Sequence, residues 1–477
     1  MLRRAWFVAW MLGLGGCFWL GAAMADEPKA PENQPDLVDE ATEPATDAPA
    51  GKDNQSDKDK DAEYYELFKV LADTMDQVER NYVKDVSRRE LMEAAIRGLL
   101  DKLDPYSNYI SPEEIDRFKT SVESQFGGIG IQVDMRQGRL VIVSPLVGSP
   151  AYRAGLQAGD MIVEIEGKSL DGVSLDEAIS RMKGEAGTSV TITVQSRGGD
   201  RRTLNLTREM IRMETVRGDR RNDEDRWEFM LDQDRKIGYI RVDSFSRETF
   251  RDLQRAMQEL EKQQLRGLVI DLRFNPGGLL TSAVEVADLF LPEGEIVSTA
   301  GRNSPKRSWT ARKPGTYEGF PMAILVNRHS ASASEIVSAA LQDHKRAIVV
   351  GERTWGKGSV QNVIELEGGK SALKLTTAGY LRPNGHNIHR ATDAKETDEW
   401  GVMPDPGFEI KLDEKELASL FEHRRKRDIL LVNHSAKPKE DGPPPEAAKT
   451  EEPKSDFVDR QLQKALEYLS GELAKAQ

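Results

Sequence analysis

The sequence predicts an α/β core that carries an inserted β-rich domain and is flanked by helical regions at both ends of the chain. Residues 235–405 alternate short apolar runs with helical stretches, which is typical of an α/β fold. Residues 126–208 instead hold short β-branched runs separated by glycines, which is typical of a small β-rich domain. With 477 residues the chain is too long for one ordinary domain, so we expect several domains joined by linkers.

The composition excludes several classes of function. The chain has 67 Lys and Arg against 80 Asp and Glu, and its net charge of −13 gives no general attraction for nucleic acid or an anionic membrane. A single cysteine, Cys17, excludes an internal disulfide and a thiolate zinc site. The six histidines form no His-Glu-x-x-His pair. We therefore expect no nucleic-acid partner, no metal and no cofactor.

The N-terminus is typical of a secretory signal peptide. A basic start precedes an apolar stretch that runs to about Leu20, and Ala23-Met24-Ala25 is a small-x-small cleavage pattern. We expect residues 1–25 to be removed and the mature protein to be exported across the inner membrane to the periplasm. Removal also deletes the only thiol, which suits an oxidising compartment. Acylation of Cys17, and hence a lipid anchor, is the alternative.

Two segments precede the β-rich domain. Residues 26–62 are acidic and proline-containing with almost no large apolar side chain, so we expect a disordered acidic linker. Residues 63–122 are expected to form an N-terminal helical region. Its first helix has an apolar face from Phe68 to Val78, its second begins at a capping box formed by Ser87 and Glu90, and its third begins near Ser111.

The β-rich domain, placed at residues 123–210, carries three motifs in a fixed order. They are Gly127-Gly128-Ile129-Gly130-Ile131, a Pro150-Ala151 to Ala154-Gly155-Leu156 turn, and Gly159-Asp160-Met161-Ile162. In this order they resemble a PDZ domain. The resemblance implies that the amides of Ile129, Gly130 and Ile131 bind the terminal carboxylate of apolar C-terminal tails on protein substrates. Taken alone, the glycines indicate only a tight turn.

The core, placed at residues 211–412, has three features that indicate chemistry. Ser330-Ala331-Ser332-Ala333-Ser334-Glu335-Ile336 follows an apolar strand and opens a helix, so a hydroxyl is displayed beside free first-turn amides. Lys357 lies between two glycines, and a serine with a neutral lysine base is a known form of nucleophilic catalysis. Asp271 to Gly278 ends a strand in a glycine-rich turn whose amides could hold an oxyanion.

Together with Leu103-Asp104-Pro105-Tyr106-Ser107 and Gly401-x-x-Pro404-Asp405, these motifs resemble the carboxyl-terminal processing peptidases over residues 67–405. These tail-specific proteases are secreted serine endopeptidases with a PDZ domain, a Ser-Lys dyad and a core like the crotonase and ClpP spiral. The resemblance implies the following roles: nucleophile Ser332, general base Lys357, lysine-orienting Gln361, and oxyanion-hole amides from Gly277, Gly278 and Ala333. Pro276 departs from an all-amide turn and leaves open which glycine donates.

Other interpretations of these residues stay open. Ser330 and Ser334 could act only as helix caps. His329 or His344 with Asp343 would form a Ser-His-Asp triad, although a histidine three residues from the nucleophile is badly placed as its base. The competing class of function is a non-catalytic secreted PDZ scaffold. The joint presence of the serine, the lysine, Gln361 and the glycine turn favours the enzyme.

Residues 413–477 are expected to be helical with a proline-rich linker, and the last helix has an apolar face from Val458 to Leu473. Because the core and the β-rich domain have apolar runs of their own, we expect the terminal helices to form a homo-oligomeric interface. A separate adaptor or activator protein is the second candidate partner. The sequence does not indicate whether the PDZ domain activates or inhibits.

Overall fold

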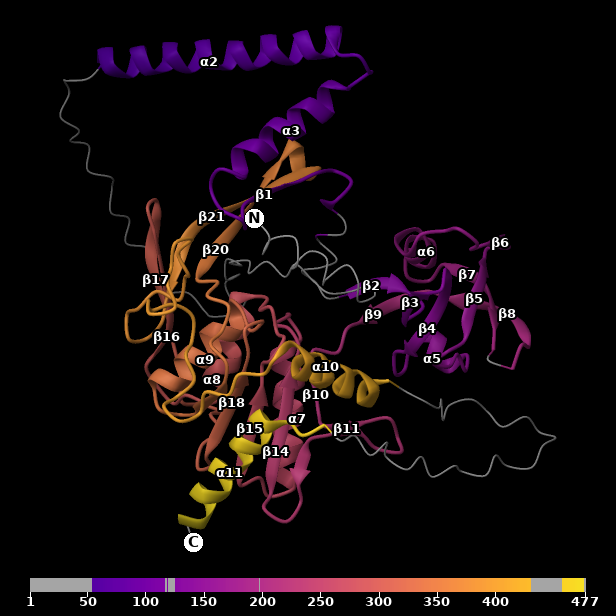
Figure 1. The fold of residues 1–477 in the computed structure, drawn as a ribbon, viewed down its shortest axis with the longest axis vertical. Helices are drawn as coiled ribbons and strands as arrows, with labels where there is room; N and C mark the ends of the chain where they lie inside the picture. Colours follow the sequence, from indigo (N-terminus) through magenta and orange to yellow (C-terminus); the bar gives the residue numbers. More distant parts are fainter. Residues whose placement is uncertain (1–53, 116–117, 119–124, 197, 430–456, 476–477) are drawn as a thin grey trace, which may run out of the picture. The chain divides into compact units, whose positions relative to one another are not determined.

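The computed structural model describes residues 54–115, 118, 125–196, 198–429 and 457–475. The chain divides into two compact units (Figure 1). The larger includes residues 116–361 and 377–477, and the smaller includes residues 26–115 and 362–376. The expected signal peptide, Cys17 and most of the expected linker lie outside the described residues.

The smaller unit contains two helices and a strand from the N-terminal region. Helix α2 (Asn54–Asn81) begins inside the expected linker, so the prediction of disorder is wrong for residues 54–62. Each residue added to an existing helix gains a backbone hydrogen bond, and acidic residues are favourable near a helix N-terminus. Helix α3 (Arg88–Leu100) begins at the expected capping box, since the Ser87 N–H donates to Glu90 Oε2 at 2.9 Å. Beyond the turn at Ser111, most of the expected third helix lies outside the described residues.

The smaller unit is completed by a hairpin that the sequence analysis had assigned to the core. Strand β1 (Asn108–Ile110) pairs antiparallel with residues 372–374 of β21 (Ser371–Leu381), which pairs in turn with β20 (Ser359–Leu366). The Asp104 carboxylate accepts the N–H groups of Tyr106 and Ser107 at 2.7 and 2.8 Å. The Leu103 to Ser107 motif therefore forms a turn that carries the chain into β1.

The PDZ-like segment of the larger unit is a six-stranded antiparallel sheet with two short helices. Its strand order is β3-β4-β5-β7-β8, with β6 on β5, and a separate pair is formed by β2 and β9. The elements are β2 (Gln125–Gly128), β3 (Ile131–Arg136), β4 (Arg139–Pro145), α5 (Pro150–Arg153), β5 (Met161–Ile165), β6 (Lys168–Ser169), α6 (Leu175–Met182), β7 (Ser189–Gln195), β8 (Arg201–Thr207) and β9 (Glu209–Arg212).

The core of the larger unit is a mostly parallel sheet of order β10-β14-β15-β18-β19, with β13 on β14. Strands β14, β15, β18 and β19 run parallel, as the alternation of strands and helices predicts. The strands are β10 (Val216–Arg217), β13 (Met230–Asp232), β14 (Ile237–Val242), β15 (Gly267–Asp271), β18 (Met322–Val326) and β19 (Ile348–Gly351). Beside this sheet lie the pairs β11 (Arg220–Arg221) with β12 (Trp227–Glu228), and β16 (Glu295–Gly301) with β17 (Ser304–Thr310).

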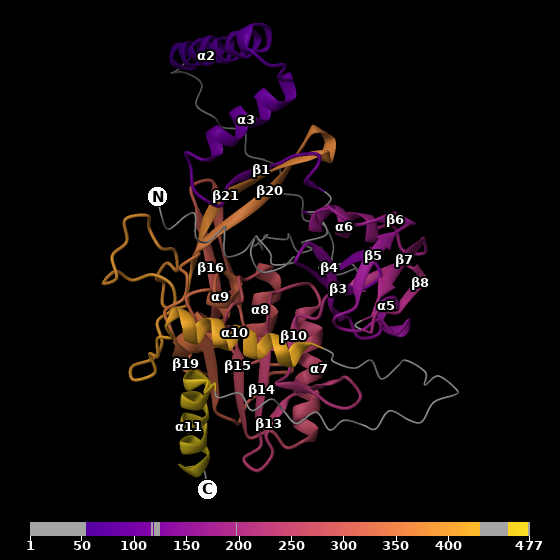
Figure 2. The same ribbon diagram turned by 45° about the vertical axis from the view of Figure 1, so that its right-hand side comes forward.

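Alternate residues of the central strands face two different helical layers. One face, including Ile240, Ile270 and Ile324, packs on α7 (Thr249–Lys262), α8 (Leu280–Asp288) and α9 (Ala333–Asp343). The other face packs on α11 (Arg460–Lys475), the yellow helix at the C-terminus in Figures 1 and 2. No described helix is long and apolar enough to cross a membrane.

The docking of α11 corrects one prediction. Ala465, Leu469 and Leu473 are buried against β14, β15, β18 and β19 of the same chain. The prediction that this apolar face forms a homo-oligomeric interface is therefore wrong. The sequence pattern alone does not distinguish packing on the same chain from packing on a second copy, because an amphipathic face can be buried equally well on either. Helix α10 (Glu414–Asp428) precedes α11 and begins at a capping box formed by Asp413 and Glu416.

Candidate active site

Ser332 lies at a sharp turn between strand β18 and helix α9. It is the N-cap residue of α9 and has φ 55°, a left-handed conformation that costs energy for a residue with a Cβ. It is fully buried, and its Oγ has no hydrogen-bond partner among the described residues. A strained serine between a strand and a helix is a known way to present a nucleophile.

The two neighbouring serines use their hydroxyls to hold this turn. Ser330 Oγ donates to the Leu272 carbonyl at 2.8 Å, and Ser334 Oγ donates to the Asn275 carbonyl at 3.0 Å. Both bonds join the serine run to the Asp271 to Gly278 segment. The geometry therefore favours Ser332 within the triplet, because the other two hydroxyls serve the structure.

The glycine turn packs directly against the serine turn. A Cβ built on Gly277 would lie 2.8 Å from Ser332 Cβ and 3.0 Å from the Ala333 nitrogen, so only glycine allows this approach. A Cβ on Gly278 would lie 2.0 Å from the Phe245 carbonyl oxygen. The structure thus brings Gly277 together with Ser332 and Ala333. The Gly277 N–H donates to Asn275 Oδ1 at 2.8 Å and is already engaged.

Lys357 is held beside this turn through its backbone. The Lys357 N–H donates to Glu335 Oε2 at 2.8 Å, and the same oxygen accepts the Ser332 N–H at 2.7 Å. Lys357 is 7% exposed, so its side chain is largely buried. Gln361 follows on β20, is fully buried, and donates from Nε2 to Ser359 Oγ at 2.9 Å.

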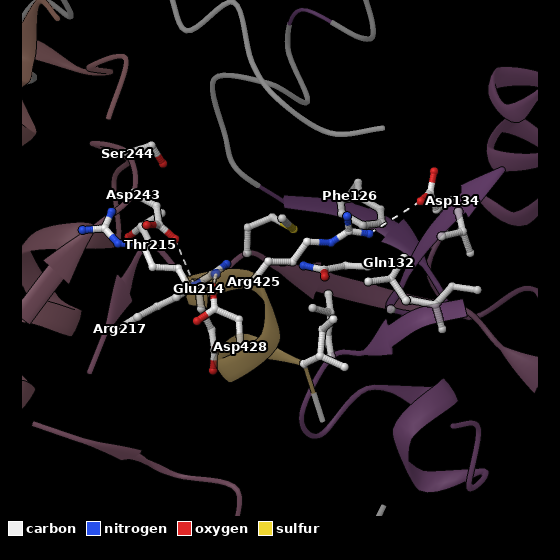
Figure 3. Close-up of a pocket in the computed structure, with 18 of the residues that line it drawn as sticks. Phe126, Gln132, Asp134, Glu214, Thr215, Arg217, Asp243, Ser244, Arg425 and Asp428 are labelled. Carbon is white, nitrogen blue, oxygen red and sulfur yellow. Dashed lines mark hydrogen bonds and ion pairs between the residues drawn. The ribbon is translucent and has the colours of Figure 1, made fainter. Parts of the chain in front are cut away.

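The loop expected to bind a carboxylate lines a cavity of about 230 Å³ in the larger unit (Figure 3). Ile129, Gly130 and Ile131 all contribute to its wall. Gly130 has φ 74°, and its carbonyl accepts the Ser149 hydroxyl at 2.9 Å, so the loop is anchored on the Gly148 to Pro150 turn. Figure 3 also shows Phe126, Gln132 and Asp134 at the cavity.

Comparison with known proteins identifies the family to which this chain belongs. Residues 236–405 match peptidase family S41, residues 141–196 match a PDZ domain, and residues 30–114 match the activating protease CtpB N-terminal domain. A carboxy-terminal-processing protease of Bartonella bacilliformis is 36% identical over 86% of this chain and 90% of its own length. The chain belongs to the carboxy-terminal-processing proteases of peptidase family S41.

Two further relatives are similar to this S41 peptidase. The carboxy-terminal processing protease CtpB of Bacillus subtilis is 36% identical over 74% of this chain and 70% of its own. A solved structure of a photosystem II D1 C-terminal processing protease is 30% identical, covers 72% of this chain and 92% of its own, and superposes with a TM-score of 0.40. The family matches and the sequence relatives confirm the sequence-based prediction of a PDZ-containing serine-type peptidase.

The histidine alternative is poorly supported in this S41 peptidase. Burial lowers the pKa of His329, and its ring stacks on Phe274 with centroids 5.7 Å apart. Asp343 instead pairs with Arg382 at 2.7 Å, and His344 Nε2 lies 2.7 Å from the Glu295 carbonyl oxygen. Both residues end the eleven-residue helix α9 that begins after Ser332, roughly 16 Å away at the rise of an α-helix.

Glu335 is the site residue that the sequence analysis missed. It is fully buried, and burial raises the pKa of its carboxyl although four hydrogen bonds to the charged form oppose that rise. The spacing of Ser332 and Glu335 matches a capping box, and that is the signal that could have identified it. Only half of such a box forms, because Glu335 accepts the Ser332 N–H while the Ser332 hydroxyl makes no return bond.

Proposed function

We propose that this peptidase is an exported endopeptidase that binds apolar C-terminal tails of protein substrates through its PDZ domain and cleaves with a Ser332–Lys357 dyad. The observation that carries the proposal is the state of the serine triplet. The hydroxyls of Ser330 and Ser334 donate to backbone carbonyls, whereas the Ser332 hydroxyl has no hydrogen-bond partner among the described residues. The backbone N–H groups of Ser332 and Lys357 both donate to Glu335 Oε2.

In the proposed reaction, Ser332 Oγ attacks the scissile carbonyl while Lys357 Nζ takes the hydroxyl proton. The amides of Gly278 and Ala333 stabilise the oxyanion, because the Gly277 amide is engaged by Asn275. Lys357 then returns the proton to the leaving amine, and water hydrolyses the acyl-enzyme by the reverse sequence. Gln361 orients the lysine. Lys357 must be neutral to start the reaction.

The proposal extends to surroundings and assembly. We place the mature protein in the periplasm, with lipid anchoring at Cys17 as the alternative, and assign the core to the crotonase and ClpP type of spiral. The parallel sheet covered by α7, α8 and α9 supports that assignment.

We propose further that α2 mediates a homo-oligomer, since Phe68 and Leu71 are 57% and 39% exposed on it. An activator protein is the alternative occupant of this face.

Two experiments test the proposal. Purified mature protein is incubated with an unfolded protein substrate that ends in an apolar tail, and with the same substrate ending in Asp-Asp. Cleavage of the first that Ser332→Ala abolishes is expected, with slower cleavage of the second. Retained cleavage by folded Ser332→Ala would refute the dyad, and no cleavage by the wild type would favour a scaffold. For the oligomer, light scattering is expected to show a smaller species for Phe68→Glu, and an unchanged mass would remove the α2 interface.

A further inference from the structure

The carboxylate of Glu335 accepts four hydrogen bonds, two on each oxygen. Oε2 accepts the N–H groups of Ser332 and Lys357 at 2.7 and 2.8 Å. Oε1 accepts the Gly356 N–H at 2.7 Å and the Thr354 hydroxyl at 2.5 Å. A carboxylate has about four acceptor positions, so all of those of Glu335 are occupied.

This occupancy limits what Glu335 can do in catalysis. A base must accept the proton of the attacking hydroxyl, but each oxygen of Glu335 already accepts from two donors that are not Ser332 Oγ. Two of these donors are backbone N–H groups of the lysine turn, those of Gly356 and Lys357. Glu335 therefore does not carry the reaction itself, and its role concerns the positions of the groups that do.

The shared oxygen fixes the spacing of the two reacting segments. Because Ser332 N and Lys357 N both bond to Glu335 Oε2, these nitrogens cannot be more than about 5.5 Å apart. The two residues lie on different segments, one at the start of α9 and the other after β19. One direct backbone hydrogen bond also joins these turns, from the Trp355 N–H to the Ser330 carbonyl at 2.9 Å. The Glu335 carboxylate adds charge-assisted hydrogen bonds at Ser332 and Lys357 themselves.

A third segment joins the same carboxylate through Thr354. The Thr354 hydroxyl donates to Glu335 and accepts the Val402 N–H at 2.7 Å. A Cβ on Gly401 would lie 2.8 Å from Thr354 Oγ1 and 3.3 Å from Glu335 Oε1, so a larger residue would press on both. This close contact explains why the Gly401 to Asp405 motif has a glycine at its first position, since that residue packs against Thr354 and Glu335.

We propose that Glu335 is a positioning residue that sets the distance between Ser332 and Lys357, with Thr354 holding its second oxygen in place. The proposal rests on the dyad proposed above. Replacement by glutamine keeps the size but turns an NH₂ group toward two of the donors, which breaks the arrangement without creating a cavity. A displacement of about 1 Å between reacting groups lowers turnover on the order of a hundredfold.

The test compares Glu335→Gln with Glu352→Gln in steady-state cleavage of an unfolded protein with an apolar C-terminal tail. Glu352 is the matched control, since it is 4% exposed and accepts the Leu412 N–H at 2.8 Å, yet it bonds neither dyad residue. We expect kcat of Glu335→Gln to fall about a hundredfold with KM within about threefold, whereas Glu352→Gln lowers the melting temperature and keeps kcat within about twofold.

A second pair covers the case in which Glu335→Gln does not fold. Thr354→Val removes both hydrogen bonds of the hydroxyl, to Glu335 and to Val402, and is expected to lower kcat at least about tenfold. Thr354→Ser keeps the hydroxyl and should restore kcat. Folded Glu335→Gln with more than a tenth of the wild-type kcat, or Thr354→Val with unchanged kcat, would overturn the positioning role. Activity in Ser332→Ala would instead refute the dyad, so the two failures are distinguishable.

Discussion

The guanidinium of Arg273 donates to both carboxylate oxygens of Asp459, at 2.8 and 2.7 Å, across 186 positions of the chain. Arg273 is 1% exposed and also bonds Asp271, which accepts the Tyr239 hydroxyl at 2.8 Å. Burial opposes ionisation of Asp459, but the charge of Arg273 lowers its pKa. The residues before α11 are thus tied to the segment that leads into the glycine turn.

Asp459→Asn is expected to destabilise the larger unit by about 1–3 kcal/mol, because a buried guanidinium loses a charged acceptor. The lowered pKa means that this contribution is present above about pH 4 and is lost as pH falls toward the folded-state pKa. Urea unfolding at pH 7 and pH 3 measures both effects. The exposed Glu467→Gln on α11 is the control, expected within about 0.5 kcal/mol of wild type. Equal stability of the two variants would contradict the role of this pair.

Deletion of residues 455–477 is expected to unfold the larger unit. The truncation would expose the sheet face that Ala465, Leu469 and Leu473 cover, and replacing one such buried leucine by alanine alone costs about 2–5 kcal/mol. The sequence analysis had instead assigned this helix to a homo-oligomeric interface. Tryptophan fluorescence and solubility measure the outcome, with Leu469→Ala as a milder variant. A truncated chain that melts like the full-length protein would refute this account.

The sequence predicts the parts of this fold whose cause is local. Apolar runs predict β14, β15 and β18, and the spacing of Ser87 and Glu90 predicts the start of α3. Features that depend on long-range pairing are missed. The β20–β21 hairpin joins the smaller unit because β1 pairs with it, and that pairing leaves no local mark. Glu335 looks like a helix cap until the loop containing Lys357 folds onto it.

Ser332→Ala is expected to lower proteolysis about a thousandfold or more, since nucleophile and base act as a unit. Ser334→Ala and Ser330→Ala should keep activity within about tenfold. Ser330→Ala is expected to cost about 1–3 kcal/mol in stability, because Ser330 Oγ also accepts the buried Asn327 N–H at 2.9 Å. Cleavage rates and melting temperatures of the three variants decide this. A folded Ser334→Ala as inactive as Ser332→Ala would show that the choice within the triplet is wrong.

The cleavage rate is expected to rise from neutral to alkaline pH, because Lys357 acts only when it is neutral. Lys357→Ala should remove most of the activity together with this rise. Measurements of kcat from pH 6 to pH 10 on the wild type, Lys357→Ala and His329→Gln test the assignment. If a transition near pH 6.5 governed the rate and persisted in Lys357→Ala but not in His329→Gln, a histidine would be the base.

The stability of the region around Lys374, on β21 in the smaller unit, is expected to increase as the pH rises into the alkaline range. Burial lowers its pKa to about 8, although the nearby Asp104 carboxylate opposes the shift. An unfolded lysine titrates near about 10.4, so between about pH 8 and 10.4 the unfolded state binds more protons and stability rises with pH, by about 1 kcal/mol per pH unit at the steepest. Below this window both states are protonated, and the cost of the buried ammonium is fully present. Lys374→Met removes the titrating group and should abolish the rise.

Hydrogen exchange of the amides at residues 372–374, which pair with β1, reports on this region at pH 7.5 and pH 9.5. After correction for intrinsic exchange, protection should increase with pH in the wild type relative to Lys374→Met, and an equal pH dependence in both proteins would show that Lys374 titrates near its usual value.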